Sequence, residues 1–350
     1  MPVELFGGSL QNIAQVIENI GEKSFRAKQI YHALYAERRS KFDDMTNLPR
    51  SLRERLGAEA QITWPRIESR FQSSDGTVRY ILALADGQSV ETVFMLETRR
   101  QTICISTQAG CPVDCKFCMT ATLGLLRNLA PGEILGQVLV ALEDNRVQLK
   151  PQTNVVLMGM GEPMLNFENV MTAVRILADP NGVGIPPRKI TLSTAGVVPG
   201  IRKLAQEKVR PKLAVSLNAT TDEVRTRLIP LNMKWPITEL LQACREYPLR
   251  PWERLTFEYV LLKGVNDSPE DARRLVRLLS HLRAKVNLIP WNPASELPFE
   301  APGDDRVLAF QEILTAKNIP AFIRKSRGQD IMAACGQLAF GAGAPAPQAD

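Results

Sequence analysis

The chain contains few of the residues that build most disulfide and metal sites. It has only two histidines, His32 and His281, and six cysteines among 350 residues. So few cysteines exclude a disulfide scaffold and make the reducing cytoplasm the expected setting. The first residues alternate polar and apolar side chains, unlike a signal peptide, and no apolar run approaches membrane-spanning length. These absences predict a cytoplasmic globular protein.

The composition is that of a well-packed protein with a moderately basic surface. Hydrophobic residues make up 45% and charged residues 23% of the chain, which is enough for one large domain and a smaller one. The formal charge is +6 and the isoelectric point is about 9.0. This balance allows an anionic partner such as RNA without requiring one.

Half of the cysteines lie in one short loop. Cys111, Cys115 and Cys118 form a CxxxCxxC array, and three thiolates this close indicate a metal-binding loop. A structural zinc site requires four nitrogen or sulfur ligands, and neither histidine is near in sequence. A four-iron cluster fits better, because three thiolates leave one iron open to a ligand that is not protein. We therefore expect a [4Fe-4S] cluster, with structural zinc as the alternative.

The first 65 residues predict a small helical domain that is rich in basic side chains. Apolar residues recur at helical spacing in 10–20, 25–37 and 48–56. The charge is compatible with an ordinary solvated surface or with an RNA-binding accessory domain. The basic side chains of this segment are Arg26, Lys28, Arg38, Arg39, Lys41, Arg50, Arg53 and Arg55.

Residues 66–100 predict a β-hairpin that links this domain to the rest of the chain, with a turn at Asp86-Gly87. From 101 to 338, strands alternate with helices, a pattern typical of a parallel sheet. We predict an α/β fold with a partial (βα)6 barrel of the TIM type. The expected strands are 102–106, 154–158, 189–193, 212–217, 256–262, 286–290 and 321–325. The tail, 339–350, is rich in Gly, Ala and Pro and is expected to be disordered.

Polar or glycine residues follow most of these strands. In barrel enzymes the carboxyl ends of the strands surround the active site, so these residues are expected to converge around one pocket. Glycines allow close backbone approach, and side chains such as Ser193, Asn218 and Asn292 offer hydrogen bonds.

Three cysteines lie outside the array. Cys244 falls in a predicted helix and is expected to be a core residue. Cys104 lies on the first barrel strand, where a small buried hydrophobe is the simplest interpretation. Cys335 precedes a glycine in a polar segment that could reach over the mouth of a pocket.

The cysteine array, with Phe117 before its last cysteine, resembles that of radical S-adenosylmethionine (SAM) enzymes. Over about residues 4–338 the chain is similar to the RlmN family of radical-SAM RNA adenine methyltransferases. The segments that carry this resemblance are FRAKQI at 25–30, MTNLP at 45–49, CISTQAGC at 104–111, GMGEP at 159–163, RG at 327–328 and AACGQL at 333–338.

The resemblance implies methylation of C2 of an adenine in 23S rRNA, near the peptidyl-transferase centre, and of the adenine next to the anticodon in tRNA. It assigns Cys335 as the methyl carrier, Cys104 as the resolving thiol and Glu91 as the base. It also implies two SAM molecules per turnover, a reductant such as flavodoxin or ferredoxin, and a monomer. The SAM contacts that it implies are Gly161, Glu162, Ser193, Ser216, Leu217, Asn218 and Asn292.

The sequence departs from the family pattern at Met119 and at Asn218, where many members have a smaller residue and a histidine respectively. From its alternating strand alone, Glu91 is expected to be exposed. Two other functions remain open: a Cfr-like methylation of C8 of the same rRNA adenine, and a non-catalytic iron–sulfur RNA-binding protein. The latter gives no reason for the second cysteine pair, Cys104 and Cys335.

Overall fold

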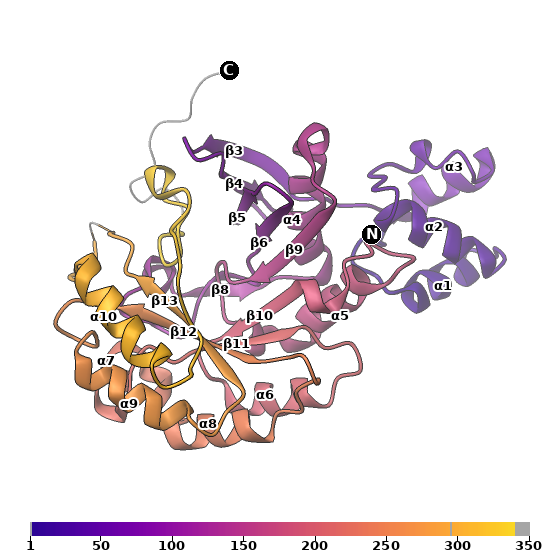
Figure 1. Cartoon of the computed structure of the whole chain (residues 1–350). Coiled ribbons are helices and arrows are strands. Elements are labelled where there is room, and N and C mark those ends of the chain that lie inside the picture. Colours follow the sequence, from indigo (N-terminus) through magenta and orange to yellow (C-terminus); the bar gives the residue numbers. More distant parts are fainter. Residues whose placement is uncertain (1, 295, 340–350) are drawn as a thin grey trace.

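The structure is a computed structural model, and it describes residues 2–294 and 296–339. A small helical domain at the amino terminus projects from a larger body that is built on one long, curved sheet (Figure 1). The predicted tail lies outside the described residues, apart from Ala339. Among the helices that the structure describes, none combines the length and apolarity required to cross a bilayer.

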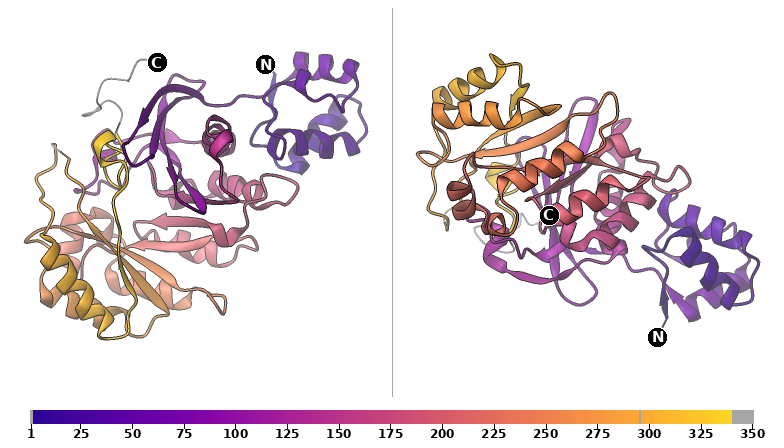
Figure 2. Two further views of the ribbon diagram at one scale, coloured as in Figure 1. Left: turned by 45° about the horizontal axis from the view of Figure 1, so that its top comes forward. Right: turned by 90° about the horizontal axis from the view of Figure 1, so that it is seen from below.

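The amino-terminal domain contains the three predicted helices, α1 (Leu10–Asn19), α2 (Phe25–Tyr35) and α3 (Arg50–Glu59). Their apolar faces pack together through fully buried side chains such as Ile13, Ile30 and Leu56. Strand β1 (Val3–Glu4) pairs in parallel with β2 (Ala60–Gln61), which joins the two ends of the domain. Figure 2 shows the domain to one side of the barrel.

The main sheet has ten strands in the order β14-β13-β12-β11-β10-β9-β6-β5-β4-β3, so it has two free edges and is an open barrel. The last three strands in this order are antiparallel, and the other seven are parallel. Their bounds are β3 (Arg66–Gln72), β4 (Val78–Ala83), β5 (Ser89–Leu96), β6 (Arg100–Cys104), β9 (Gln152–Leu157), β10 (Ile190–Thr194), β11 (Lys212–Ser216), β12 (Leu255–Leu261), β13 (Ala284–Pro290) and β14 (Ala321–Ile323).

Helices connect the parallel strands and cover the outer face of the barrel (Figure 2). This arrangement confirms the predicted partial (βα)6 barrel, because each parallel strand up to β13 is followed by helix before the next one. The helices are α4 (Pro131–Asp144), α5 (Phe167–Ala178), α6 (Val198–Ala205), α7 (Asp222–Leu228), α8 (Ile237–Glu246), α9 (Pro269–Leu279) and α10 (Asp304–Thr315).

The two faces of the barrel strands differ in polarity. On β12, Phe257 and Tyr259 are fully buried in the main core, whereas the alternate residues, among them Glu258, point to the interior of the barrel. Partly accessible polar side chains occupy the corresponding positions on neighbouring strands, for example Ser216 and Asn287. The barrel interior is therefore a polar lumen that is suited to a ligand.

A second, two-stranded hairpin was not predicted from the sequence. Strands β7 (Gln108–Gly110) and β8 (Leu125–Asn128) pair in antiparallel fashion and bracket the cysteine loop. Gly110 has a φ of +77°, and a Cβ atom there would lie 1.9 Å from the carbonyl oxygen of Gly124. Only glycine allows this close approach, which fixes where the cysteine loop begins.

Candidate active site

The cysteine loop is held by hydrogen bonds to several elements around it. The backbone amide of Cys111 donates to the carbonyl of Gly124 (2.8 Å), and that of Lys116 donates to Leu228 (2.9 Å). The indole of Trp291, which directly follows β13, donates to the carbonyl of Phe117 (3.1 Å). These contacts attach the loop to the carboxyl ends of the barrel strands, where the active sites of barrel enzymes lie.

The three thiols of this loop suit an iron–sulfur cluster. They act on one another electrostatically, and burial raises the pKa of each thiol, to about 12 for Cys111. Buried thiolates therefore require a positive centre, which a bound cluster supplies. No group of three or more described His, Cys, Asp or Glu side chains converges on a single-ion site. A four-iron cluster does not require such convergence, because each thiolate binds a different iron.

Arg225 is a fully buried arginine next to this loop, and sequence reasoning missed it. Its guanidinium donates to the carbonyls of Ala195 (2.6 Å) and Ser216 (3.1 Å), to that of Leu217 (3.1 Å), and to the Asn232 side chain (2.9 Å). It thereby ties together the loops that follow β10 and β11, and it lies close enough to Cys115 for the two charges to interact. The charge-rich pattern of α7 gave no sign that one arginine turns inward.

The carboxyl-terminal segment, residues 328–339, closes over the same end of the barrel (yellow in Figure 1). The carbonyl of Gly336 accepts a hydrogen bond from the Met119 amide (2.8 Å), and the Thr120 hydroxyl donates to the carbonyl of Leu338 (2.7 Å). The Asn292 side chain donates to the carbonyl of Cys335 (2.9 Å). The segment thus covers this end of the barrel and presents Cys335 beside the cysteine loop.

Cys335 and Cys104 lie close enough to interact electrostatically, although 230 residues separate them in the sequence. Cys335 is exposed to solvent, whereas Cys104 is 8% exposed and packs in an apolar cluster with Ile331, Ala333 and Leu338 of the carboxyl-terminal segment. Burial raises the pKa of both thiols, because protein atoms surround each sulfur. The Cys335 residue as a whole still keeps access to solvent. The Cys335 thiol is close enough to raise the pKa of Cys104 further. By contrast, Cys244 is 2% exposed in the core on α8, as predicted.

Glu91 is fully buried, so its expected exposure was wrong. Val93 of β5 pairs with Cys104 of β6, and Glu91 lies two residues before Val93. Side chains two residues apart share a face of a sheet, so Glu91 and Cys104 point to the same side. The carboxyl-terminal segment covers this face, which is why the strand alternation misled the prediction.

The environment of Glu91 leaves it poised between its two protonation states. Burial raises the pKa of its carboxyl from its usual value to about 7, although the Arg79 guanidinium, 3.4 Å away, and the amide of Ala339 both oppose this rise. One carboxylate oxygen, Oε1, is buried and has no hydrogen-bond partner among the described residues. A carboxyl group with a free oxygen and a pKa near 7 is suited to general-base chemistry.

The predicted SAM contacts all lie at or just beyond the carboxyl ends of β9, β10, β11 and β13. Gly161 has a φ of +97°, and a Cβ atom there would lie 2.6 Å from the Gln108 side chain. The carboxylate of Glu162 accepts hydrogen bonds from the amides of Met164 (3.1 Å) and Ala195 (2.6 Å), which join the loops after β9 and β10.

Two further side chains of this set, besides Glu162, already have protein partners. Asn218, with a φ of 55°, accepts a hydrogen bond from the Val260 amide (2.8 Å), and Asn292 accepts from Ser326 and Gln329 as well as donating to Cys335. Ser193 and Ser216 are partly accessible, while Leu217 is fully buried and offers its backbone. The predicted SAM contacts therefore offer pre-positioned backbone and two hydroxyls that have no hydrogen-bond partner among the described residues. The structure shows that Met119, one departure from the family pattern, is buried under the carboxyl-terminal segment.

Comparisons with known proteins agree with this geometry. The model of the radical SAM superfamily matches residues 105–276, and that of the ribosomal RNA large subunit methyltransferase N-terminal domain matches residues 3–62. A "Probable dual-specificity RNA methyltransferase RlmN" of Koribacter versatilis is 52% identical, with 92% of this chain and 97% of that protein covered. The dual-specificity RNA methyltransferase RlmN of Anaeromyxobacter dehalogenans is 46% identical, with 97% and 92% covered.

A solved structure is similar over the same range. The crystal structure of a radical SAM methyltransferase from Sphaerobacter thermophilus superposes with a TM-score of 0.91 at 44% identity, and the match covers 96% of this chain and 99% of that one. Both the accessory domain and the barrel therefore have counterparts in relatives of the same length. The chain belongs to the RlmN family of radical SAM RNA methyltransferases.

Proposed function

We propose that this enzyme methylates C2 of one adenine in 23S rRNA, near the peptidyl-transferase centre, and C2 of the adenine next to the anticodon in tRNA. The observation that carries the proposal is that Cys104 and Glu91 share one face of the sheet, and that the segment carrying Cys335 covers this face beside the cysteine loop. Adenine C2 is an electron-poor ring carbon that bears a hydrogen. It is too weak a nucleophile to attack SAM directly, so its methylation requires a different route.

Cys335 carries the methyl group in this proposal. Its thiol loses a proton, and the sulfur then displaces the methyl group of a first SAM. The [4Fe-4S] cluster on Cys111, Cys115 and Cys118, with a second SAM, supplies the radical chemistry that removes one hydrogen from the Cys335 methyl group. The accessible position of Cys335 beside the cysteine loop suits both steps, the methyl transfer from the first SAM and the removal of hydrogen with the second.

The other two side chains complete the transfer. The carbon radical on Cys335 adds to C2 of the adenine, and the adduct radical then gives up one electron, which the oxidised cluster would take back. Glu91 accepts the C2 proton through its Oε1, which has no hydrogen-bond partner among the described residues. The Cys104 thiolate attacks the sulfur of Cys335, and the carbon–sulfur bond breaks. The released carbon takes up a proton to become the methyl group of the RNA, and a disulfide remains between the two cysteines. This disulfide must be reduced before the next turnover.

The remaining requirements follow from the same chemistry. We propose that two SAM molecules are used per turnover, and that a flavodoxin or a ferredoxin supplies the electrons. Free thiols and ribosomal substrates suit the cytoplasm. We propose a monomer, because one chain supplies the cysteine loop, both thiols and the base.

The helical domain at 1–65 is proposed as an RNA-binding accessory domain, joined through the hairpin region at 66–100 to the barrel at 101–338. Many of its basic side chains are already engaged with carboxylates. Ion pairs join Arg38 to Glu143, Arg39 to Glu37, Arg50 to Glu54 and Arg55 to Glu22. Its positive charge is therefore partly neutralised within the protein, and further RNA contacts are expected elsewhere.

The proposed function is tested by nucleoside analysis. The purified enzyme, loaded with iron and sulfide without oxygen, is incubated with SAM, a reductant and unmodified rRNA or tRNA. Mass spectrometry of the digested RNA should reveal 2-methyladenosine in both. Formation of 8-methyladenosine would favour the Cfr-like alternative, and the absence of any methylated adenosine would favour the non-catalytic alternative.

Glu91 is expected to give the methyl-transfer step its pH dependence. Because burial raises the pKa of its carboxyl to about 7, the group is protonated below that pH and cannot accept a proton. The single-turnover rate of enzyme already methylated on Cys335 should rise with pH through about 7 and then level off. Glu91→Gln should lower this rate by about 100-fold or more and abolish the rise.

A matched control is Glu253→Gln, which alters a carboxylate that is 2% exposed just before β12, at the opposite ends of the strands. It should keep the rise near pH 7. An unchanged pH profile in Glu91→Gln would show that another group accepts the proton.

A further inference from the structure

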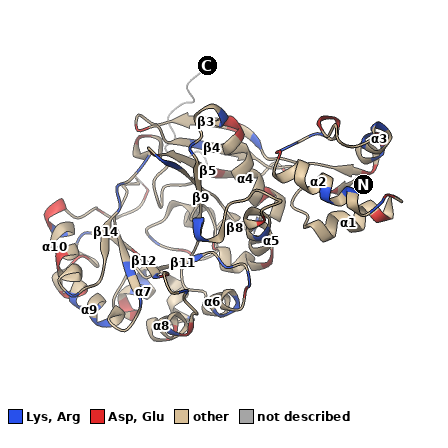
Figure 3. Cartoon of the chain, turned by 45° about the vertical axis from the view of Figure 1, so that its right-hand side comes forward, with Lys and Arg blue, Asp and Glu red and all other residues tan. Residues whose placement is uncertain are grey.

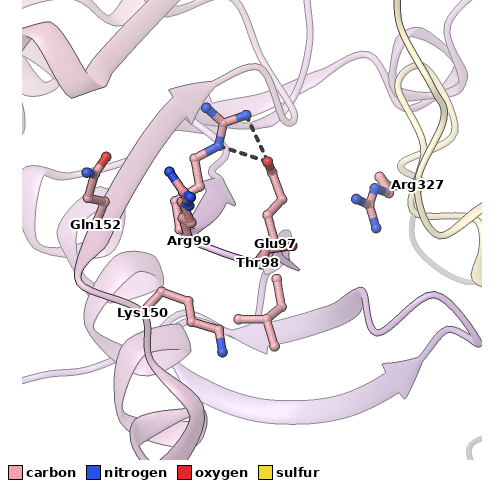
Figure 4. A pocket seen from close by; sticks show the side chains of 8 residues that line it. Glu97, Thr98, Arg99, Lys150, Gln152 and Arg327 are labelled. Atoms are coloured by element: carbon pink, nitrogen blue, oxygen red, sulfur yellow. Dashed lines mark hydrogen bonds and ion pairs between the residues drawn. The ribbon is translucent and has the colours of Figure 1, made fainter.

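A basic pocket, drawn in Figure 4, lies at the amino ends of β6 and β9, whereas the cysteine loop is attached to the carboxyl ends of the barrel strands. It has a volume of about 810 Å³ and is formed by the β5–β6 turn, the start of β9 and Arg327, which directly precedes the carboxyl-terminal segment. Four of its eight lining residues are cationic, namely Arg99, Arg100, Lys150 and Arg327, and one, Glu97, is acidic.

Most of the positive charge in this pocket has no acidic partner in the part of the chain that the structure describes. Arg100 is paired with Glu97 at 2.8 Å. No carboxylate of a described residue lies within ion-pair distance of Arg99, Lys150 or Arg327. This distinguishes the pocket from the outer helices, where basic and acidic positions are interspersed (Figure 3) and arginines such as Arg273 and Arg277 pair with Glu270.

The positive charge continues across the amino ends of the barrel strands. Lys212 begins β11, and its pKa is lowered by burial first and then by the nearby cations Lys285, Lys189 and Arg100. Glu253 is the carboxylate that opposes them there. Lys189 directly precedes β10 and donates to Gln152, which lines the pocket. The pocket therefore opens beside a wider group of cations at one end of the lumen.

The opposite end of the lumen is covered. The cysteine loop and the carboxyl-terminal segment are joined there through Met119 and Thr120, and Trp291 packs beneath the loop in an apolar cluster with Phe117. A large polyanionic substrate must reach Cys335 from a side that these two segments leave open. The basic pocket marks such a side, since Arg327 lies only eight residues before Cys335.

We propose that this pocket binds backbone phosphates of the RNA strand that carries the target adenine, through Arg99, Lys150 and Arg327. The inference rests on the proposed function, because it assumes an RNA substrate. Phosphate contacts of this kind fix the register of a strand without reading its sequence, which suits an enzyme with two different RNA substrates.

The dimensions fit such a contact. From Arg100 to Cys104, β6 rises about 13 Å, at 3.3 Å per residue. That is about four nucleotides at the rise of a stacked strand, and fewer once the strand is unstacked. The target adenine must leave its stack to reach Cys335, so phosphates of flanking nucleotides would lie near the pocket while the base enters the lumen.

The test compares two triple variants that remove the same charge. Arg99→Gln/Lys150→Gln/Arg327→Gln should weaken binding of a tRNA anticodon stem-loop at least about 10-fold and reduce the slope of log affinity against log salt by about 2, since each lost phosphate contact removes roughly 0.7. Arg202→Gln/Arg273→Gln/Arg277→Gln alters exposed arginines of the outer helices and should leave both values near those of the unaltered enzyme.

Two further measurements separate the possible failures. Methylation of Cys335 by SAM without RNA, measured as protein mass, should be unchanged in the pocket variant. The double variant Arg99→Gln/Lys150→Gln, which leaves the carboxyl-terminal segment intact, should show about two thirds of the effect on the salt slope. The pocket inference is overturned if the unaltered enzyme methylates adenine but the pocket variant binds RNA with unchanged affinity and slope. It is also overturned if both triple variants lose RNA affinity to the same extent. If the unaltered enzyme methylates no RNA, the proposed function itself fails.

Discussion

Cys104→Ala should start the reaction and remain joined to its RNA through Cys335, whereas Cys335→Ala should carry no RNA at all. The physical reason is the position of the two thiols. Cys104 packs against the segment that carries Cys335, so it is the neighbouring thiol that can attack the sulfur of the adduct. Without it the carbon–sulfur bond to the RNA persists. A denaturing gel with labelled RNA should show the linked species only in Cys104→Ala.

The two variants should be equally inactive in multiple turnover, so the gel, rather than the rate, separates their roles. Cys244→Ala is the matched control, because it removes a buried thiol from the core of α8 and should leave turnover intact. The double variant Cys104→Ala/Cys335→Ala should not be linked to RNA. Turnover by either single variant, or a linked species in the double variant, would contradict the assigned roles.

Removal of the three loop cysteines should abolish both iron binding and every radical step. After anaerobic reconstitution the unaltered protein should contain about four irons per chain, and Cys111→Ala/Cys115→Ala/Cys118→Ala should contain almost none. The loop presents three thiols whose burial makes a cationic centre necessary, and alanine removes every one of these ligands. Iron analysis and the visible absorption of the cluster measure the difference, and air should bleach the cluster.

The chain offers a control that also removes three cysteines. Cys104→Ala/Cys244→Ala/Cys335→Ala should keep the full iron content, because none of the three belongs to the loop. It should also retain reductive cleavage of SAM while transferring no methyl group to RNA. A full iron complement in the loop variant would show that the array does not bind the cluster. The array would then have another role, such as binding structural zinc, which metal analysis would detect.

The features that could be predicted from the sequence are those that depend on local pattern. The alternation of strands with helices is repeated along the chain, and each repeat independently indicates a parallel sheet. The spacing of the loop cysteines fixes their proximity whatever the fold around them. The helices of the first domain likewise follow from the local spacing of their apolar residues. These expectations did not depend on how distant segments pack.

The features that could not be predicted depend on contacts between distant segments. Glu91 is buried because residues from the end of the chain cover its strand, and no pattern around position 91 reports this. Arg225 turns inward because carbonyls from two other loops accept its hydrogen bonds. The hydrogen bond from Val260 to Asn218 depends in the same way on a partner 42 positions away in the chain.

The covering segment of residues 328–339 also has a consequence for how the enzyme is assembled. The loop cysteines, Arg225 and every strand of the barrel precede this segment in the chain, so a ribosome completes the barrel first. The segment is then held by hydrogen bonds to the β3–β4 turn, through Asp75, and to the loop itself, through Met119. Iron and sulfide can therefore be delivered to an uncovered loop during maturation, before the methyl carrier is folded over it.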